Sequence, residues 1–329
     1  MPTTVGVLIE RQEEADALWN QCDGGFGAHA GFRLVGQDTS ADRVLCFGTP
    51  IPAGGVTLAP GSRLRARVRG RSRSDLTLEA AWRGLGRDPT GVDVIFYEPP
   101  PVVADAAYEL ARRHARRVFG PDPRATHRLR LPSLWTIGAP LGVLRDAPAP
   151  EGERLHESKP VALACVTSGK RMIPGHAERL GFLKCLREAG VGMELFGRGV
   201  EASLGGRGSV ASKAHAMWPA RCTLAIENHA EGDEYVTEKL WDALACWSLP
   251  LYYGSRAPDA MIPPESFIRL PDLGEAGVEA VRAAVGDESA YLARLPAIGE
   301  ARRRMFGELR MTEWIRREVL AVGGGSGDA

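Results

Sequence analysis

Short apolar runs alternate with longer segments of helical periodicity along most of the chain. In the N-terminal half, the apolar runs predict strands at Val5–Ile9, Arg43–Phe47 and Val92–Tyr97. Amphipathic segments predict helices at about 11–20, 75–84 and 104–118. The N-terminus therefore has the pattern of a first strand and helix, and it lacks the basic region and apolar core of a signal peptide.

The C-terminal half repeats this alternation more clearly. Its predicted strands are Val161–Val166, Met193–Gly197, Cys222–Ile226, Leu249–Tyr253 and Phe267–Leu270. Its predicted helices lie at about 176–189, 236–247, 275–285 and 298–321. Strands that alternate with helices of ten or more residues indicate βαβ units and a parallel sheet.

A stretch rich in proline, glycine and charge, residues 140–160, separates the two halves. We therefore predict an N-terminal domain over 1–145, a linker over 146–160 and a C-terminal domain over 161–322. The final helix could also pack back on the N-terminal domain. The glycine-rich end, 323–329, is predicted to be a disordered tail.

Composition narrows the range of functions. The 329 residues include 41 basic and 41 acidic side chains, so the whole chain offers no electrostatic case for nucleic acid or for more than peripheral membrane contact. No apolar run approaches the length of a membrane-spanning helix. The six cysteines are scattered and form no CxxC pair, which favours free thiols in a reducing cytoplasm. The sequence leaves the oligomeric state open.

The densest group of polar residues lies at the start of a predicted helix, in the stretch ENHAEGDEYVTEKLWDALACWSLPLYYGS. Tyr235, Glu238 and Lys239 are spaced i, i+3 and i+4, which places them on one side of the first helical turn. In parallel α/β sheets, ligands bind at the carboxyl ends of strands beside helix N-termini. The spacing suits a nucleotide, with Lys239 on a phosphate, Glu238 on ribose hydroxyls and Tyr235 packing against it or donating a hydrogen bond to it. The alternative is a solvated helix start with an acidic first turn.

This stretch resembles the donor-binding motif of the α1,3/α1,4-fucosyltransferases, in which Glu-Asn is followed by Tyr-Val/Ile-Thr-Glu-Lys. The later segment IPPESFIRLPDL resembles the Pro-x-x-Ser-Phe-Ile stretch of that family. The resemblance adds Glu227 and Asn228 to the expected donor site. Two departures are Ile226 in place of the usual Phe and His229 in place of Ser or Thr.

The resemblance extends upstream with weaker motifs. The helix AERLGFLKCLREAG is similar to one in which an Arg contacts the donor pyrophosphate, a role that would fall to Arg179. A planar, permanently charged guanidinium suits that ligand. Lys213 fits a family Lys and would contact a phosphate or the base. For each of these two residues the alternative is an ordinary surface cation.

The resemblance implies a GT-B architecture, α/β with two Rossmann-like doubly wound domains facing a cleft, and an inverting transfer. Such a reaction needs one general base for the acceptor hydroxyl. In the family this base is a Glu at the end of an N-domain strand. Here VDVIFYEPPPVV places Glu98 after a predicted strand and before three prolines. The alternative for Glu98 is an ordinary exposed carboxylate at a strand end.

The expected function is therefore transfer of L-fucose from GDP-fucose to a glycan or glycoconjugate hydroxyl. Alternatives are the same fold with another GDP-sugar, or a non-catalytic nucleotide-sugar-binding module. The sequence contains no Asp-x-Asp triplet, and we expect no cofactor and no obligatory metal, because Arg and Lys can neutralise the leaving group. The acceptor and its linkage are not predicted.

One feature lies outside these motifs. Arginines occupy every odd position from Arg63 to Arg73, which on a strand would place all six on one face. Such a face could attract an anionic acceptor or an anionic membrane surface. The alternative, which we favour, is a solvated edge strand protected from aggregation by its charge.

Overall fold

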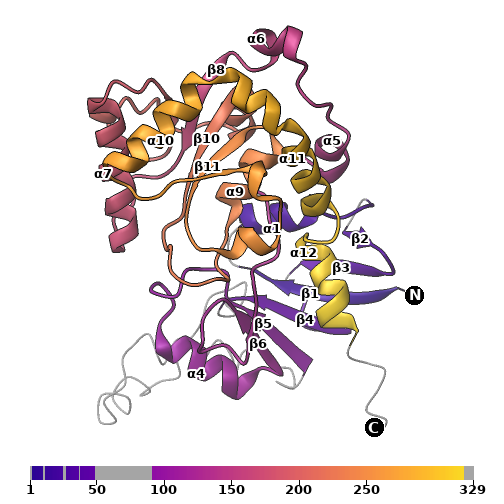
Figure 1. The fold of residues 1–329 in the computed structure, drawn as a ribbon. Coiled ribbons are helices and arrows are strands. Elements are labelled where there is room, and N and C mark those ends of the chain that lie inside the picture. Colours follow the sequence, from indigo (N-terminus) through magenta and orange to yellow (C-terminus); the bar gives the residue numbers. More distant parts are fainter. Residues whose placement is uncertain (1, 10–11, 25–26, 37, 49–90, 322–329) are drawn as a thin grey trace, which may run out of the picture. The chain divides into compact units, whose positions relative to one another are not determined.

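The computed structural model describes residues 2–9, 12–24, 27–36, 38–48 and 91–321, and it divides the chain into two compact units (Figure 1). Unit 1 comprises Met1–Leu131 and Thr312–Ala329, and unit 2 comprises Pro132–Met311. Each is an α/β unit built on its own sheet.

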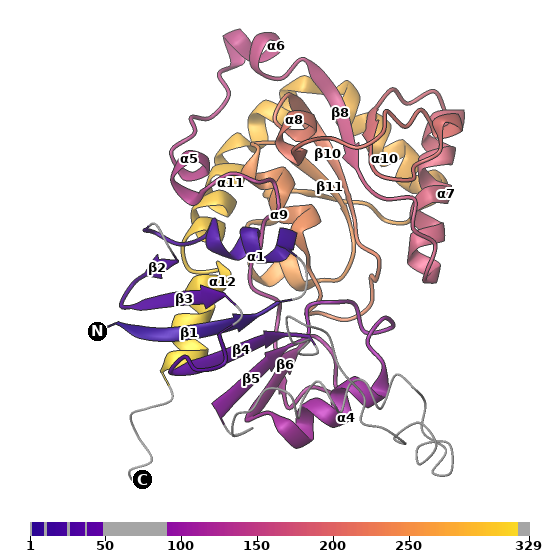
Figure 2. The same cartoon turned by 180° about the vertical axis from the view of Figure 1, so that it is seen from behind.

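Unit 1 contains a sheet in the order β2-β3-β1-β4-β5-β6-β7 (Figure 2). The strands are β1 (Thr3–Leu8), β2 (Ala28–His29), β3 (Phe32–Gly36), β4 (Arg43–Phe47), β5 (Val92–Ile95), β6 (Arg117–Gly120) and β7 (His127–Arg128). All neighbouring pairs are parallel except the β2–β3 hairpin. The helices of its N-terminal part include α1 (Gln12–Trp19) and α4 (Asp105–His114), which contacts β6.

Strand β6 corrects one prediction. The sequence placed residues up to 118 in a single helix, but α4 ends at His114 and the backbone N–H of Arg116 donates to Val92 O at 2.7 Å. Arg116 and Arg117 then both donate to the buried carboxylate of Asp93 on the adjacent β5. This ion pairing fixes the start of β6, and local periodicity cannot reveal it because the partner lies more than twenty positions earlier.

The C-terminal residues group with unit 1. After α12 (Met311–Trp314) the chain continues as a π-helix, Ile315–Leu320, which contacts β4. Glu313 accepts a hydrogen bond from the buried His29 at 3.0 Å, and the ring of Trp314 meets Phe119 edge-on at 5.0 Å. The chain therefore returns to its first sheet at the end.

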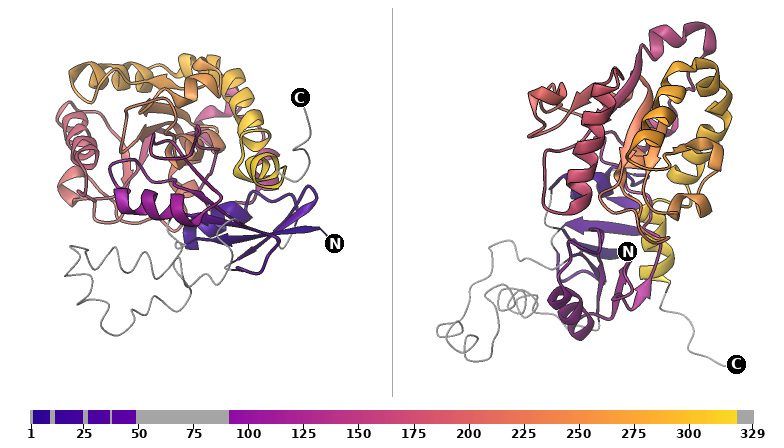
Figure 3. Two further views of the ribbon diagram at one scale, coloured as in Figure 1. Left: turned by 90° about the horizontal axis from the view of Figure 1, so that it is seen from below. Right: turned by 60° about the vertical axis from the view of Figure 1, so that its left-hand side comes forward.

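Unit 2 contains a parallel sheet in the order β12-β11-β10-β8-β9. Its strands are β8 (Val161–Val166), β9 (Glu194–Phe196), β10 (Ala220–Ile226), β11 (Leu249–Tyr253) and β12 (Ile268–Arg269). Its α-helices are α5 (Leu141–Arg145), α6 (Leu155–Ser158), α7 (Pro174–Glu188), α8 (Lys213–Met217), α9 (Glu238–Ala245), α10 (Glu275–Gly286) and α11 (Glu288–Phe306). Figure 3 gives two further views of these elements.

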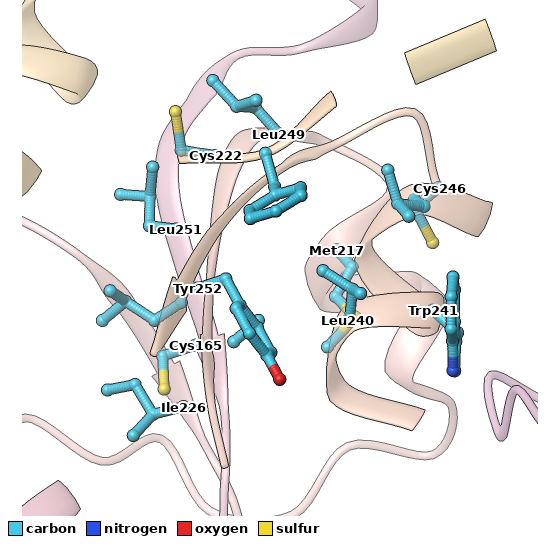
Figure 4. Packing of buried hydrophobic residues seen from close by; sticks show 14 of the residues in the cluster. Cys165, Met217, Cys222, Ile226, Leu240, Trp241, Cys246, Leu249, Leu251 and Tyr252 are labelled. Carbon is cyan, nitrogen blue, oxygen red and sulfur yellow. The ribbon is translucent and has the colours of Figure 1, made fainter. Parts of the chain in front are cut away.

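The core of unit 2 lies on both faces of this sheet. Helices α8 and α9 contact β10, and α10 contacts both β10 and α7. Trp241 and Tyr252 are fully buried in this cluster, where side chains of β10 and β11 lie beside those of α8 and α9 (Figure 4). Burial of apolar surface on both faces explains why these strands are continuous hydrophobic runs in the sequence.

The domain boundary expected at residue 145 lies inside unit 2. Trp135, Ile137, Leu141 and Leu144 are buried in the core of unit 2, so residues 132–145 belong there and not to the N-terminal domain. The stretch expected to be a linker also contributes to this core, because Leu155 of α6 is fully buried in it. Unit 2 thus begins well before the proline-rich stretch.

The last long helix also differs from the prediction. It begins at Glu288, where the side chain of Asp287 accepts from the N–H of Ala290 at 3.0 Å, and it ends at Phe306, before Gly307. The single helix expected over 298–321 corresponds to three elements in the structure: the second half of α11, α12 and the π-helix. Pro296 lies inside α11, although proline in a helix interior removes a backbone hydrogen bond.

Two buried cations cap the C-terminal end of α9. Arg302 donates to the carbonyls of Leu244 and Ala245, and the ammonium of Lys159 donates to Cys246 O and Trp218 O, both at 2.5 Å. The last carbonyls of a helix lack intrahelical partners and carry partial negative charge. These contacts hold the end of α9 that is opposite to its polar first turn.

Burial lowers the pKa of Lys159 from 10.5 to about 7, with Cys246 opposing the shift and Arg302 adding to it. Between these values the unfolded chain binds the proton and the folded chain does not, so this group makes stability rise with pH over that window. Lys159→Met should lower the free energy of unfolding by roughly 1–3 kcal/mol through the two undonated carbonyls. Denaturant titrations should show this deficit widening from pH 7 towards pH 10, and a constant deficit would mean that Lys159 keeps its proton.

The described residues contain neither a membrane-spanning helix nor a cluster of metal-ligating side chains. No helix among them is both long and apolar enough to cross a membrane. No group of three or more His, Cys, Asp or Glu side chains among them is arranged to hold a metal ion. All six cysteines are free thiols.

Candidate functional site

The candidate site lies at the carboxyl ends of β8 and β10 in unit 2. The chain leaves β8 towards β9 on one side of the sheet and later returns to β10 on the other side, so the strand order reverses between β8 and β10. Ligands of open α/β sheets bind outside the carboxyl ends of the strands at such a point. Ser168 follows β8 there, and Glu227 and Asn228 follow β10.

Arg179 bridges the ends of these two strands from α7. Its side chain is buried, and its guanidinium donates to Asn228 Oδ1 and to Ser168 O, the latter at 3.1 Å. The N-terminus of α7 approaches closely, because a Cβ on Gly175 would lie 2.1 Å from Asn228 O. A buried guanidinium held in this way places a fixed positive charge at the carboxyl ends of β8 and β10.

Glu227 organises the entry into α9. Its fully buried carboxylate accepts from the N–H and the hydroxyl of Thr237, both at 2.7 Å, and from Lys239 Nζ at 3.4 Å. Thr237 immediately precedes the helix, so Glu227 fixes the first turn relative to β10. The motif residue Glu227 therefore has a structural task that the sequence analysis did not foresee.

Glu238 lies between two ammonium groups. Its Oε1 is 3.4 Å from Lys239 Nζ and 3.9 Å from Lys213 Nζ, and the Glu238 side chain is 28% exposed. Burial alone would raise its pKa, but Lys239 and then Lys213 outweigh that effect and lower it to about 2. Glu238 is thus an ionised acceptor at neutral pH, as a carboxylate that binds two hydroxyls must be.

Lys213 is engaged by groups of unit 2 that the sequence analysis missed. Its Nζ donates to Asp242 Oδ2 at 2.8 Å and to Thr136 Oγ1 at 2.6 Å. Asp242 is fully buried and lies one turn after Glu238 on α9. The i, i+4 spacing of Glu238 and Asp242 was the available signal, since it places both carboxylates on one helix face.

Tyr235 is buried beside the same loop. Its backbone carbonyl accepts from Ser255 Oγ at 2.5 Å, and its ring meets that of His229 edge-on with centroids 5.9 Å apart. Ser255 follows β11, so this contact ties the loop after β10 to the loop after β11. The structure thus places Tyr235 beside the carboxyl end of β11.

The site thus combines the cations Arg179, Lys213 and Lys239 with the carboxylates Glu227, Glu238 and Asp242. Burial lowers the pKa of His176, and the charges of Arg179, Lys170 and Lys239 lower it further. Such an arrangement can neutralise a diphosphate while the ionised Glu238 accepts hydrogen bonds from hydroxyl groups.

Glu98 belongs to unit 1. It is half-buried and lies just after β5, next to the buried Pro99. Strand β5 ends at Ile95, two residues earlier than predicted. Glu98 and the donor-site residues belong to different units. The role of Glu98 as the base that acts at the donor site therefore stays a prediction. The arginines between Arg63 and Arg73 lie outside the described residues.

Comparison with known proteins bears on these observations. Residues 158–291 match the model of "Glycosyltransferase family 10 (fucosyltransferase) C-term". This match confirms the resemblance inferred from the Tyr-Val-Thr-Glu-Lys motif, and it contains every predicted donor-site residue. The comparison with curated protein sequences finds no match.

Solved structures resemble the whole chain. An α1,3-fucosyltransferase is 16% identical, with a TM-score of 0.54, over 98% of this chain and 91% of that one. A structure of α1,3-fucosyltransferase with GDP is 17% identical, with a TM-score of 0.50, over 89% of this chain and 81% of that one. The β-glucosyltransferase of T4 phage is 9% identical, with a TM-score of 0.53, over 98% and 100%. With the two mainly parallel sheets, these likenesses confirm the predicted α/β class and GT-B type.

Other structures of the T4 phage enzyme, with TM-scores of 0.51, contain UDP-glucose or UDP with Mn²⁺. At this level of identity the likeness concerns the fold alone.

Proposed function

We propose that this chain, a glycosyltransferase that carries a family 10 domain in residues 158–291, transfers L-fucose from GDP-fucose to a glycan hydroxyl with inversion. One observation carries the proposal. The family match includes the polar cluster at the β8–β10 switch point, where Arg179, Glu238 and Lys239 come together around the first turn of α9. The sequence motif, its position in the fold and the charges of these side chains thus all support a GDP-sugar as the ligand.

In the proposed complex the donor nucleotide lies on unit 2. Arg179 and Lys239 neutralise the diphosphate, and Glu238 accepts hydrogen bonds from the ribose hydroxyls. Asn228 and Glu227 hold Arg179 and Lys239 in place through the contacts described above. Tyr235 packs beside the bound nucleotide. The direct contact predicted for Lys213 remains a prediction.

The proposed reaction is a single displacement at the anomeric carbon. The acceptor oxygen attacks that carbon, the bond from the carbon to the diphosphate oxygen breaks, and GDP leaves with the bonding electrons. Glu98 accepts the proton of the acceptor hydroxyl. Attack from the face opposite to GDP inverts the configuration.

The proposed mechanism requires no metal ion, because Arg179 and Lys239 compensate the charge of the leaving diphosphate. We expect EDTA to leave most transferase activity intact. Assays with EDTA, and with EDTA followed by Mn²⁺, check this. Loss of activity that Mn²⁺ restores would contradict the metal-independent mechanism.

The donor sugar is the finer part of the proposal. The motif surrounds the nucleotide more than the sugar, so another GDP-sugar is the first alternative, and a non-catalytic binding module is the second. Thermal unfolding in the presence of GDP-, UDP-, CDP- and TDP-sugars identifies the donor that binds, and a transfer assay with that donor separates an enzyme from a binding module. We expect the GDP-sugars to raise the melting temperature and GDP-fucose alone to support transfer. A rise with UDP-glucose and none with GDP-sugars would overturn the assignment.

A further inference from the structure

Thr136, Lys213 and the buried Asp242 form a hydrogen-bonded chain, and Lys213 Nζ also lies 3.9 Å from Glu238 Oε1. Asp242 accepts from the N–H of Thr136 at 2.6 Å and from its hydroxyl at 3.0 Å. Lys213 Nζ donates to the same hydroxyl at 2.6 Å and to Asp242 at 2.8 Å. The Thr136 hydroxyl therefore accepts from Lys213 and donates to Asp242, so each member of the chain has a partner.

Three separate segments of unit 2 meet in this chain. Thr136 lies in the segment that opens the unit, Lys213 begins α8, and Asp242 lies on α9. Ser212 joins the same segments, because its hydroxyl donates to Ile137 O at 2.7 Å and also accepts from the N–H of Ala214 to cap α8. The position of the Lys213 ammonium is thus fixed from two sides.

We propose that Thr136, Lys213 and Asp242 are positioning residues for the donor carboxylate Glu238. The ammonium of Lys213 lies between the two carboxylates of one helix face, 2.8 Å from Asp242 and 3.9 Å from Glu238. It places a second positive charge beside Glu238, whose Oε1 also lies 3.4 Å from Lys239 Nζ. The proposal rests on the proposed function, because it assumes that Glu238 binds the ribose.

The alternative is that the chain only stabilises the fold, since a buried carboxylate must be compensated in any case. The two roles make different predictions for a double-mutant cycle. A purely structural change weakens GDP binding equally whether or not Glu238 is present. A change that acts through Glu238 has no effect once Glu238 is removed.

The test uses the full chain, with GDP as the probe. Thr136→Val keeps the volume and removes the hydroxyl, whereas Thr136→Ser keeps the hydroxyl. By calorimetry we expect Thr136→Val to weaken GDP binding roughly 3- to 10-fold, the worth of one hydrogen bond, and Thr136→Ser to bind within about twofold of wild type. In the Glu238→Ala background, Thr136→Val should change the affinity by less than about twofold.

Lys213→Gln serves as a second variant should Thr136→Val fold poorly. It retains an N–H donor for Asp242 and Thr136 and removes the charge beside Glu238, so the same weakening and the same dependence on Glu238 are expected. Equal losses with and without Glu238, or unchanged affinity in both variants, would overturn the positioning role and leave the proposed function standing. Absence of GDP binding by the wild-type chain would instead reject the proposed function, and this inference with it.

Discussion

Replacing Glu98 by glutamine should lower the turnover of the transferase roughly 10²- to 10⁴-fold, the usual contribution of one positioned base. Glutamine is nearly isosteric but cannot accept the proton of the acceptor hydroxyl. The fold should persist, because Glu98 is only half-buried and lies beyond the end of β5. Steady-state kinetics with saturating donor measures the change.

The same variant separates binding from catalysis. Glu98 belongs to unit 1 and the predicted donor residues belong to unit 2, so Glu98→Gln should bind GDP as tightly as the wild type. Near-native turnover of Glu98→Gln would reject Glu98 as the base. Among the other acidic groups of unit 1, Asp93 is an unsuitable replacement, because its buried carboxylate is engaged by Arg116 and Arg117.

Removing the charges of the first turn of α9 should have the second largest effect. Lys239→Ala should weaken GDP binding by on the order of 1.5–3 kcal/mol, the worth of a hydrogen bond to a charged group, and Glu238→Ala by a similar amount. The physical reason differs between the two, since Lys239 neutralises phosphate and Glu238 accepts from the ribose. Calorimetric titration with GDP measures both.

Lys184→Ala is the matched control for these variants. Lys184 lies on α7 of the same unit, and its exposed ammonium pairs only loosely with Glu188 at 3.6 Å. Its removal changes the charge of unit 2 by the same amount as Lys239→Ala and affects an exposed side chain of α7, so the affinity for GDP should stay at the wild-type value. Equal affinity in all three variants would show that the nucleotide binds elsewhere.

The strands of unit 2 were predictable because their local and tertiary preferences agree. Val161–Val166 and Leu249–Tyr253 are strands over the residues that the apolar runs indicate, and both are buried on two faces. Glu238 and Lys239 open α9 as the helical pattern indicates, whereas Tyr235 precedes the helix, because α9 begins at Glu238 after its N-cap residue Thr237 and not at 236.

The remaining features depend on contacts between distant segments. The hairpin of β2 and β3 escaped prediction because Ala30 and Gly31 form its turn with positive φ angles of 26° and 89°, an arrangement without a strong sequence signal here. Thr136 and Asp242 are 106 positions apart and become partners only in the folded unit. The apolar residues near Trp135 likewise gave no indication of which unit would bury them.

The central claim is that GDP binds at the carboxyl ends of β8 and β10, and hydrogen–deuterium exchange with and without GDP tests it most directly. With GDP bound, peptides that cover 168–180 and 227–240 should exchange more slowly than without GDP, because they contain Arg179 and the first turn of α9. Peptides that cover 147–159, which precede β8 at the amino end of the sheet, should exchange at an unchanged rate. Protection confined to 147–159, or no protection in unit 2 at saturating GDP, would contradict the account.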